Sequence, residues 1–336
     1  MKNPERGRTL SMANDWQTQL ADSFTHLKDL LQFLQLPGLA EGLSETPFPF
    51  RVTRAFAQRM EKGNPNDPLL RQVLPRAAET LVHPDDLDDP VGDLGASPAP
   101  GLIQKYQARV LLITTGACAI HCRYCFRRNY PYQTEHLQRE SWQTLISHLK
   151  ENPGVHEVIL SGGDPLVLSN ERLKALFDRL AAQSQIDTIR LHSRLPVVLP
   201  DRIDPGFLKL METQGPRVVL VTHVNHPNEL DETVHDALRR LTLVGVTLLN
   251  QSVLLAEIND QAETLIRLSR RLFQMGVLPY YLHELDRARG VRHFEVSNGH
   301  SVALIDQLRR ALPGYLVPRL VREVPGAPFK VPTDRP

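Results

Sequence analysis

The chain has 336 residues, of which 41% are hydrophobic and 23% are charged, with 39 Lys and Arg against 38 Asp and Glu. This composition is ordinary for a globular protein and excludes whole-chain disorder, collagen and coiled coil. The balanced charge favours neither nucleic acid nor a membrane surface as a partner, so a small polar substrate is expected. No apolar segment approaches the ~18 residues of a membrane span. No signal-peptide stretch follows Met1, and we expect a cytoplasmic protein.

Residues 1–100 are expected to form an N-terminal helical extension and linker. Apolar residues recur at helical spacing from Leu20 to Leu34, and Pro37 and Gly38 end this pattern. A second helix is expected over 51–62. Residues 83–100 are rich in Asp, Pro and Gly and carry few large apolar side chains, which is typical of a loop.

From residue 101 to about 300, short aliphatic segments alternate with segments of helical length. The predicted strands are 110–114, 155–160, 188–192, 218–222, 246–250 and 278–283. Helices are predicted near 141–151, 170–183, 205–213, 230–243 and 260–275. After the first interval the strands start roughly 30 residues apart, the length of a β-α-β unit. Because the strands are nearly continuously apolar, we expect them to be parallel and buried on both faces.

Polar side chains follow each of the six predicted strands. The segments concerned are 115–118, 161–164, 192–194, 223–226, 250–252 and 284–286. Solvation of loops explains a polar segment after any one strand. Six such segments in series favour one shared site, because the carboxyl ends of the strands carry the active site of a (β/α) barrel.

All three cysteines of the chain fall within eight residues, as a C-x-x-x-C-x-x-C array formed by Cys118, Cys122 and Cys125. Cysteine-rich loops of cytosolic proteins usually bind metal or do redox chemistry. Three thiolates can ligate three irons of a cubane cluster and leave the fourth iron open to a small molecule. A structural zinc held by the cysteines and His121 is the alternative, although this spacing is unusual for zinc and no second C-x-x-C motif is present.

The array, with an aromatic residue before its last cysteine and directly after the first strand of a βα series, resembles the signature of the radical S-adenosylmethionine (SAM) superfamily. This resemblance implies the α/β class, as a partial (β/α)6 TIM-like barrel over residues 101–300. It implies a 4Fe–4S cluster held by Cys118, Cys122 and Cys125. It also implies that the amino and carboxylate groups of SAM chelate the fourth iron.

Several segments are also similar to the lysine 2,3-aminomutases, and they occur in that family's order. They are 105–110, 122–128, 222–229, 250–255, 280–286 and 325–332. The last of them resembles the segment that carries the lysine for pyridoxal 5′-phosphate (PLP). Residues 301–336 are therefore expected to form a short C-terminal segment that carries the PLP lysine.

The family resemblance implies a set of SAM-binding residues. Ser161, Gly162, Gly163 and Asp164 look like the glycine motif that contacts the SAM amino group, and glycine lets a backbone approach a ligand closely. Gln251 is expected near SAM. His223 and Asn225 are expected near SAM or the PLP ring, without individual roles.

The same resemblance implies that Lys330 binds PLP covalently and is displaced by the amine of the substrate. Lys105, Tyr106 and Arg109 are expected at the PLP phosphate, where charge-assisted donors suit the anion. Migration of an amino group between adjacent carbons has no easy two-electron route. The cofactors therefore carry the hard chemistry and the protein positions them.

For L-lysine as substrate, the resemblance implies that Arg127 binds the carboxylate as a bidentate pair. A buried ammonium group is costly unless it is paired. Asp286 and Glu323 are expected to provide that pairing, although the family has an Asp where this chain has Glu323.

The compact length and the C-terminal segment look most like the branch of the family that makes (R)-β-lysine for attachment to elongation factor P. This branch implies a functional link to elongation factor P and its β-lysine ligase, an electron-donor protein of the flavodoxin type and a possible homo-oligomer. A free-standing metabolic lysine 2,3-aminomutase is the first alternative. A non-catalytic Fe–S scaffold protein is the second.

Overall fold

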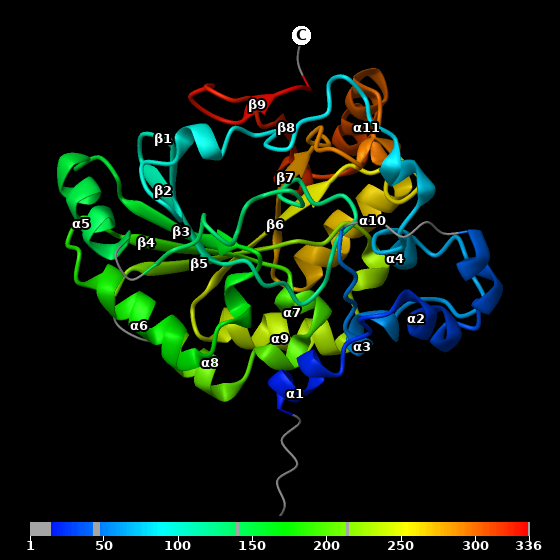
Figure 1. Cartoon of the computed structure of the whole chain (residues 1–336), viewed down its shortest axis with the longest axis horizontal. Helices are drawn as coiled ribbons and strands as arrows, with labels where there is room; N and C mark the ends of the chain where they lie inside the picture. Colours follow the sequence, from blue (N-terminus) through cyan, green and yellow to red (C-terminus); the bar gives the residue numbers. More distant parts are fainter. Residues whose placement is uncertain (1–14, 43–47, 139–140, 213–214, 335–336) are drawn as a thin grey trace, which may run out of the picture.

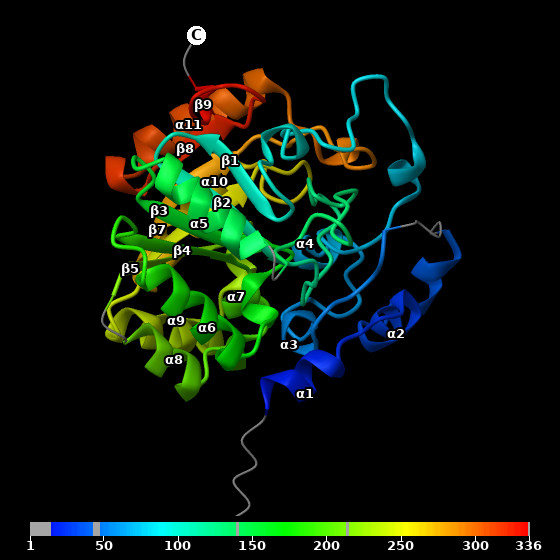
Figure 2. The ribbon, with the colours of Figure 1, turned by 60° about the vertical axis from the view of Figure 1, so that its left-hand side comes forward.

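The computed structural model describes residues 15–42, 48–138, 141–212 and 215–334. At its centre is one nine-stranded sheet in which the strands follow one another in chain order. Strands β2 to β8 are parallel, whereas β1 and β9 pair antiparallel at the two ends of the sheet. The sheet curves as a partial barrel with helices outside it (Figures 1 and 2). The predicted fold class is therefore confirmed.

All six strands predicted from the sequence are present. They are β2 (Arg109–Thr115), β3 (Glu157–Gly162), β4 (Thr188–Ser193), β5 (Arg217–Thr222), β6 (Thr247–Val253) and β7 (Leu278–His283). Three further strands are β1 (Leu102–Tyr106), β8 (Arg319–Arg322) and β9 (Val331–Pro332). Strand β8 adds a seventh parallel strand beyond residue 300. Its two buried residues lie between exposed arginines, so it lacks the longer apolar segment that reveals a buried strand.

The helices that cover the sheet are α5 (Ser141–Glu151), α6 (Asn170–Ala181), α7 (Leu195–Val198), α8 (Pro205–Met211), α9 (Glu232–Leu243), α10 (Ala262–Gln274) and α11 (Asn298–Ala311). Four of them, α6, α8, α9 and α11, begin at side-chain caps and bury one apolar face. Ser169, Asp231 and Ser297 each accept a hydrogen bond from a backbone N–H in the first helical turn. In the described ranges, none of the helices is long and apolar enough to cross a bilayer.

The described part of the N-terminal segment, residues 15–42 and 48–100, contains four short α-helices. They are α1 (Trp16–Ala21), α2 (Leu27–Phe33), α3 (Arg54–Ala57) and α4 (Pro68–Arg71). The helix predicted over 51–62 is wrong in its extent, because Val52 pairs with Phe24 in an extended backbone bridge and α3 begins only after the Thr53 cap. Trp16 and Phe56 share one apolar core with barrel residues such as Leu191. The division of the chain at residues 100 and 300 stays a prediction.

Single turns of 3-10 helix connect many of these elements. They are η1 (Pro37–Gly42), η2 (Ala77–Thr80), η3 (Leu94–Ala96), η4 (Pro165–Val167), η5 (Pro200–Arg202), η6 (Pro227–Glu229), η7 (Arg292–Phe294) and η8 (Gly314–Leu316). Residues 83–100 are largely irregular, as predicted, but they pack on the barrel. The backbone of Leu87 exchanges hydrogen bonds with Arg287 and Arg289.

Two glycines at the end of β3 allow the chain to pack against the loop that follows β2. Gly162 has a φ of +125°, which disfavours other residues. The Gly163 N–H donates to the Thr115 carbonyl at 2.7 Å. A Cβ atom on Gly163 would lie 2.2 Å from the carbonyl oxygen of Ala117, so no side chain fits there.

We expect Gly163→Ala to lower the free energy of unfolding by about 1–3 kcal/mol, the usual cost of overpacking, because the contact is with backbone. Gly154→Ala is the matched control, since a Cβ there meets nothing within 4 Å. The control should change stability by at most about 1 kcal/mol. Denaturant unfolding of the cofactor-free protein measures both values, and equal values for the two variants would contradict the close-approach argument.

Candidate active site

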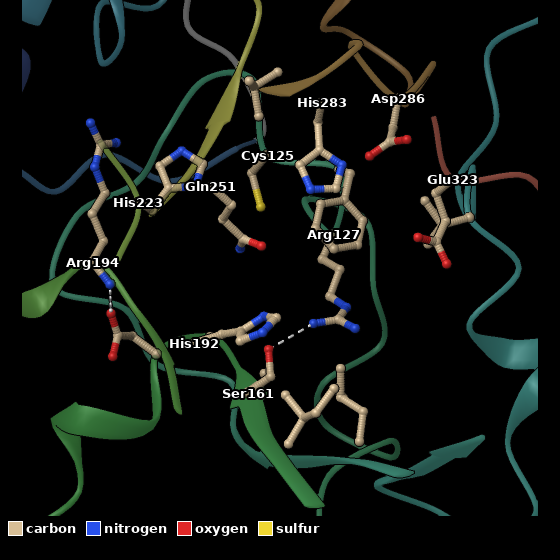
Figure 3. Close-up of a pocket in the computed structure, with 18 of the residues that line it drawn as sticks. Cys125, Arg127, Ser161, His192, Arg194, His223, Gln251, His283, Asp286 and Glu323 are labelled. Carbon is tan, nitrogen blue, oxygen red and sulfur yellow. Dashed lines mark hydrogen bonds between the residues drawn. The ribbon is translucent and has the colours of Figure 1, made fainter. Parts of the chain in front are cut away.

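The carboxyl ends of the parallel strands surround a cavity of about 290 Å³. Figure 3 shows side chains from several strands and loops pointing into it. All but one of the site residues predicted from the sequence line this cavity, the exception being Asn225. Those that line it are Lys105, Tyr106, Arg109, Cys118, Cys122, Cys125, Arg127, Ser161, Gly162, Gly163, Asp164, His223, Gln251, Asp286, Glu323 and Lys330.

The three cysteines lie on the loop after β2 as free, partly buried thiols. Burial, followed by the charges of neighbouring cysteines, raises the pKa of Cys118 well above its ordinary value and that of Cys125 to about 11. Clustered thiols of this kind favour a cationic partner, because iron or another metal deprotonates a coordinating thiol. Among the described residues, no three His, Cys, Asp or Glu side chains are arranged around a single ion position.

The cluster loop is fixed by an ion-pair network that begins in the N-terminal segment. Glu79, on η2, pairs with Arg123 and with Arg128, at 2.7 Å to the latter. All three side chains are at most 4% exposed. Burial raises the pKa of Glu79, but the two arginines outweigh it and lower that pKa overall. Glu79 thus holds two residues of the segment that also carries Cys125.

The Asp164 carboxylate accepts four hydrogen bonds from groups of the protein. It accepts hydrogen bonds from the Ser193 hydroxyl and the Arg194 N–H, both at 2.7 Å, and from the N–H groups of Leu166 and Leu195. It therefore ties the end of β3 to the end of β4. Figure 3 shows the bond to the Arg194 backbone.

A chain of alternating charges runs along one wall of the cavity. Arg127 donates from Nε to Asp93 at 2.7 Å and from Nη1 to the Ser161 hydroxyl at 3.2 Å. The other oxygen of Asp93 lies 2.6 Å from the Lys105 ammonium group. Burial raises the pKa of Asp93, but the charges of Arg127 and Lys105 outweigh it and lower that pKa. The same charges explain how a carboxylate is tolerated at 3% exposure.

The chain of charges continues into the C-terminal segment. Glu323 follows β8 and accepts hydrogen bonds from Lys330 and, at 2.7 Å, from the Tyr106 hydroxyl. Lys105 lies 3.5 Å from the same carboxylate. Lys330 therefore lies at the cavity, close to residues from the first strands of the barrel, and not on the outer surface.

Several polar side chains of the cavity have no hydrogen bond or ion pair within the described residues. They include the guanidinium of Arg109, the amide of Gln251 and the carboxylate of Asp286. Arg109 lies over the Tyr106 ring, with 4.2 Å between Cζ and the ring centroid. Burial raises the pKa of Asp286 to about 7, although Lys330 acts in the opposite direction.

Several residues of the site are not singled out by the sequence. Asp93 lies in the segment expected to be a linker, where no pattern distinguishes one acidic residue. His192 and His283 line the cavity beside the expected His223, and burial lowers the pKa of each: His223 to about 3, and His192 and His283 well below their ordinary values. Asn225 is absent from the cavity wall, because its amide donates to Tyr124 and Gln72.

Comparisons with known proteins agree with this geometry. The model of the radical SAM superfamily matches residues 112–250. The chain is 45% identical, over 95% of its length and 94% of the relative, to an L-lysine 2,3-aminomutase of Escherichia coli (strain K12). It is 40% identical to that of Haemophilus influenzae, over 94% of each chain. It is 35% identical to that of Clostridium subterminale, over 95% of this chain and 77% of that one. A solved radical SAM methyltransferase from Sphaerobacter thermophilus matches with a TM-score of 0.47 and 15% identity, over 66% of this chain and 68% of that chain.

Membership of the radical SAM superfamily implies a 4Fe–4S cluster and SAM as cofactors, and the three cysteines at the cavity agree with that requirement. The high identity extends over nearly the whole chain and nearly the whole of the first two relatives. The chain therefore belongs to the L-lysine 2,3-aminomutase family, a family of isomerases within the radical SAM superfamily.

Proposed function

We propose that the protein converts L-α-lysine to (R)-β-lysine with a 4Fe–4S cluster, SAM and PLP. One observation carries this proposal: the three cysteines, the Lys330 amine and two charged side chains suited to the ends of lysine all line one cavity. SAM on the reduced cluster supplies a hydrogen-abstracting radical, and PLP supplies the aldehyde that carries the migrating nitrogen.

Cys118, Cys122 and Cys125 would hold the cluster. Burial, followed by the charges of neighbouring cysteines, raises the pKa of the Cys118 and Cys125 thiols, and bound iron ions would stabilise their thiolates. Ser161, Gly162, Gly163, Asp164 and Gln251 are proposed for SAM. Of these, Gln251 carries an amide that has no partner among the described residues, whereas Asp164 acts by fixing the loop.

Lys330 would bind PLP covalently, with Lys105, Tyr106 and Arg109 around the phosphate. Arg109 makes no ion pair within the described part of the chain and is therefore available to an anion. Lys105 is shared between Asp93 and Glu323, so it contributes a positive charge from a fixed position. Tyr106 contributes a hydroxyl group that Glu323 orients.

Arg127 would bind the carboxylate of lysine. Asp93 holds its Nε and Ser161 holds Nη1, so Nη2 remains for the substrate and the plane of the guanidinium is fixed. Asp286 and Glu323 would bind the distal ammonium group. Glu323 is paired with Lys330 here, and it becomes available once Lys330 is bound to the cofactor and is no longer an ammonium group.

The proposed use of the product is the β-lysylation of elongation factor P. The chain is similar in length to two relatives of high identity, which are matched over 94% of their own length, and this supports the branch of compact enzymes. A metabolic lysine 2,3-aminomutase shares the chemistry and remains the alternative. The discriminating experiment is anaerobic incubation with L-lysine, SAM, PLP and a reductant, followed by chiral analysis of the amino acids. We expect (R)-β-lysine; mostly (S)-β-lysine would argue against the elongation factor branch, and no product would favour the Fe–S scaffold alternative.

We expect Lys330→Ala to abolish the visible absorbance of bound PLP and to reduce turnover at least about 1,000-fold, because the covalent attachment is lost. Absorbance after gel filtration and product formation measure the two effects. Lys174→Ala is the control, since this lysine lies on α6 in an exposed ion pair with Asp178. An unchanged absorbance in Lys330→Ala would mean that another lysine binds the cofactor.

The pH dependence of lysine use should reflect Asp286. Its pKa is raised to about 7, so the carboxylate that pairs with the substrate ammonium is present above that pH and is lost as pH falls through it. We expect kcat/KM for lysine to fall about tenfold per pH unit below 7, because only the ionised form binds the ammonium. The Asp286→Asn variant should turn over lysine slowly, and its kcat/KM should no longer show an inflection near pH 7. If the inflection persists in Asp286→Asn, another group is responsible.

A further inference from the structure

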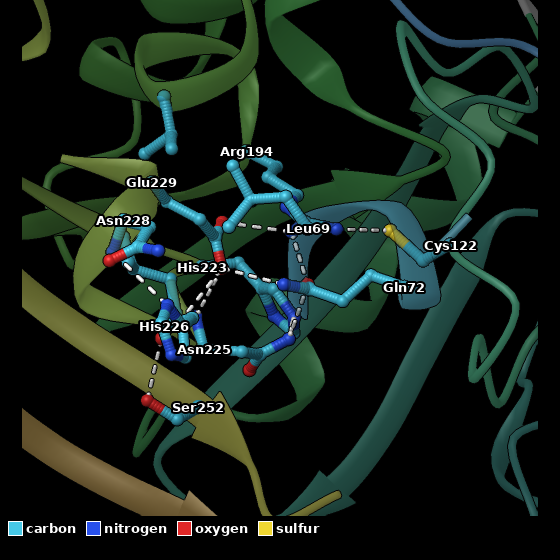
Figure 4. A network of polar contacts seen from close by, with 12 residues as sticks. Leu69, Gln72, Cys122, Arg194, His223, Asn225, His226, Asn228, Glu229 and Ser252 are labelled. Atoms are coloured by element: carbon cyan, nitrogen blue, oxygen red, sulfur yellow. Dashed lines mark hydrogen bonds and ion pairs between the residues drawn. The ribbon is translucent and has the colours of Figure 1, made fainter. Parts of the chain in front are cut away.

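Arg194, directly after β4, contacts one of the three cysteines. Its Nη1 lies 2.7 Å from the sulfur of Cys122 (Figure 4) and 2.8 Å from the Tyr124 hydroxyl. The Arg194 side chain is only 6% exposed. A charged N–H group therefore points at a proposed ligand of the cluster from a site that water barely reaches.

Buried partners from distant parts of the chain hold this guanidinium in place. Its Nη2 donates to Gln72 at 2.6 Å and to Glu229 at 2.9 Å. The N–H groups of Asn225 and His226 donate to the other Glu229 oxygen, at 2.9 and 3.0 Å. Glu229 is therefore itself fixed, and Arg194 has little freedom to leave the sulfur.

The contact is asymmetric among the three thiols. Within the described residues, Cys122 accepts a hydrogen bond from a charged side chain, whereas the sulfurs of Cys118 and Cys125 accept none from a charged side chain. The Arg194 Nε is buried and has no partner in that part of the chain. A charge in such a dry environment acts more strongly on its neighbours than a charge in water.

We propose that Arg194 raises the reduction potential of the 4Fe–4S cluster through this contact with Cys122. Reduction brings one electron from an external one-electron reductant into the cluster and adds one negative charge to the cluster and its thiolates. A fixed positive charge and an N–H donor at a ligand sulfur stabilise that added charge. The inference rests on the proposed ligation by the three cysteines, and it assigns Arg194 as a residue that tunes the cluster without touching the substrate.

Glu229 supplies the opposing charge. Its carboxylate neutralises Arg194 in part and so limits the increase in potential. Removal of Arg194 and removal of Glu229 should therefore shift the potential in opposite directions. If the two substitutions only disrupted the folded network, both variants would shift the reduction potential in the same direction.

The experiment is a redox titration of the reconstituted full chain with dithionite and mediators, followed by the EPR signal of the reduced cluster, without SAM or lysine. We expect a midpoint potential below that of the wild type in Arg194→Gln and above it in Glu229→Gln. Arg194→Lys keeps the charge and should fall between wild type and Arg194→Gln. If Arg194→Gln does not retain iron, the potential of Arg194→Lys is compared with that of the wild type instead.

An unchanged or higher potential in Arg194→Gln with normal iron content would overturn the proposed tuning but leave the proposed function intact. A lower potential in both Arg194→Gln and Glu229→Gln would also overturn it, since the network would then be only structural. If the wild-type protein forms no EPR-active cluster while Cys122→Ala binds the same amount of iron, the cysteine ligation fails, and the proposed function fails with it.

Discussion

A buried cation must be paired with a carboxylate, because desolvation without a partner costs several kcal/mol. This constraint arranges the cavity. Two of the four carboxylates that line it, and a third carboxylate beside the cluster loop, each pair with two cations, so the position of one charged side chain depends on the next. The shared carboxylates are Asp93 between Arg127 and Lys105, Glu323 between Lys105 and Lys330, and Glu79 between Arg123 and Arg128. The proposed substrate arginine is thereby connected to the proposed PLP lysine through salt bridges alone.

The same constraint gives the N-terminal segment a place in the site. Gln72, Glu79 and Asp93 all precede the parallel strands, yet each binds an arginine at the cavity or in the cluster loop. Backbone contacts act in the same direction, since the N–H groups of Arg123 and His121 donate to carbonyl groups of this segment. The barrel supplies the cysteines and glycines, whereas the preceding residues hold the cluster loop against it.

The sequence predicts what depends on local pattern. Six strands, the cysteine loop and the glycine turn follow from apolar runs and spacing, and resemblance places the remaining candidates on the cavity wall. Asp93 could not be found in this way, and Arg194 is predicted only as part of the polar segment 192–194, without a role. Each is a single charged residue in a loop, and its role depends on a partner far away in the sequence, which no periodicity reveals. The packing of Gly163 on Ala117 is likewise a tertiary contact, although the glycine itself is conspicuous.

Pairing also separates the positioning side chains from those that await a ligand. Arg109, Gln251 and Asp286 face the cavity without hydrogen bonds or ion pairs in the described residues, and buried polar groups are normally satisfied. A ligand can supply the missing partners: an anion for Arg109, a polar group for Gln251 and an ammonium group for Asp286. Glu323 differs, because Lys330 pairs with it. Of the two carboxylates proposed for the lysine ammonium, Asp286 is thus unpaired within the described residues, whereas Glu323 would be released for the substrate only if the proposed attachment of PLP removes the charge of Lys330.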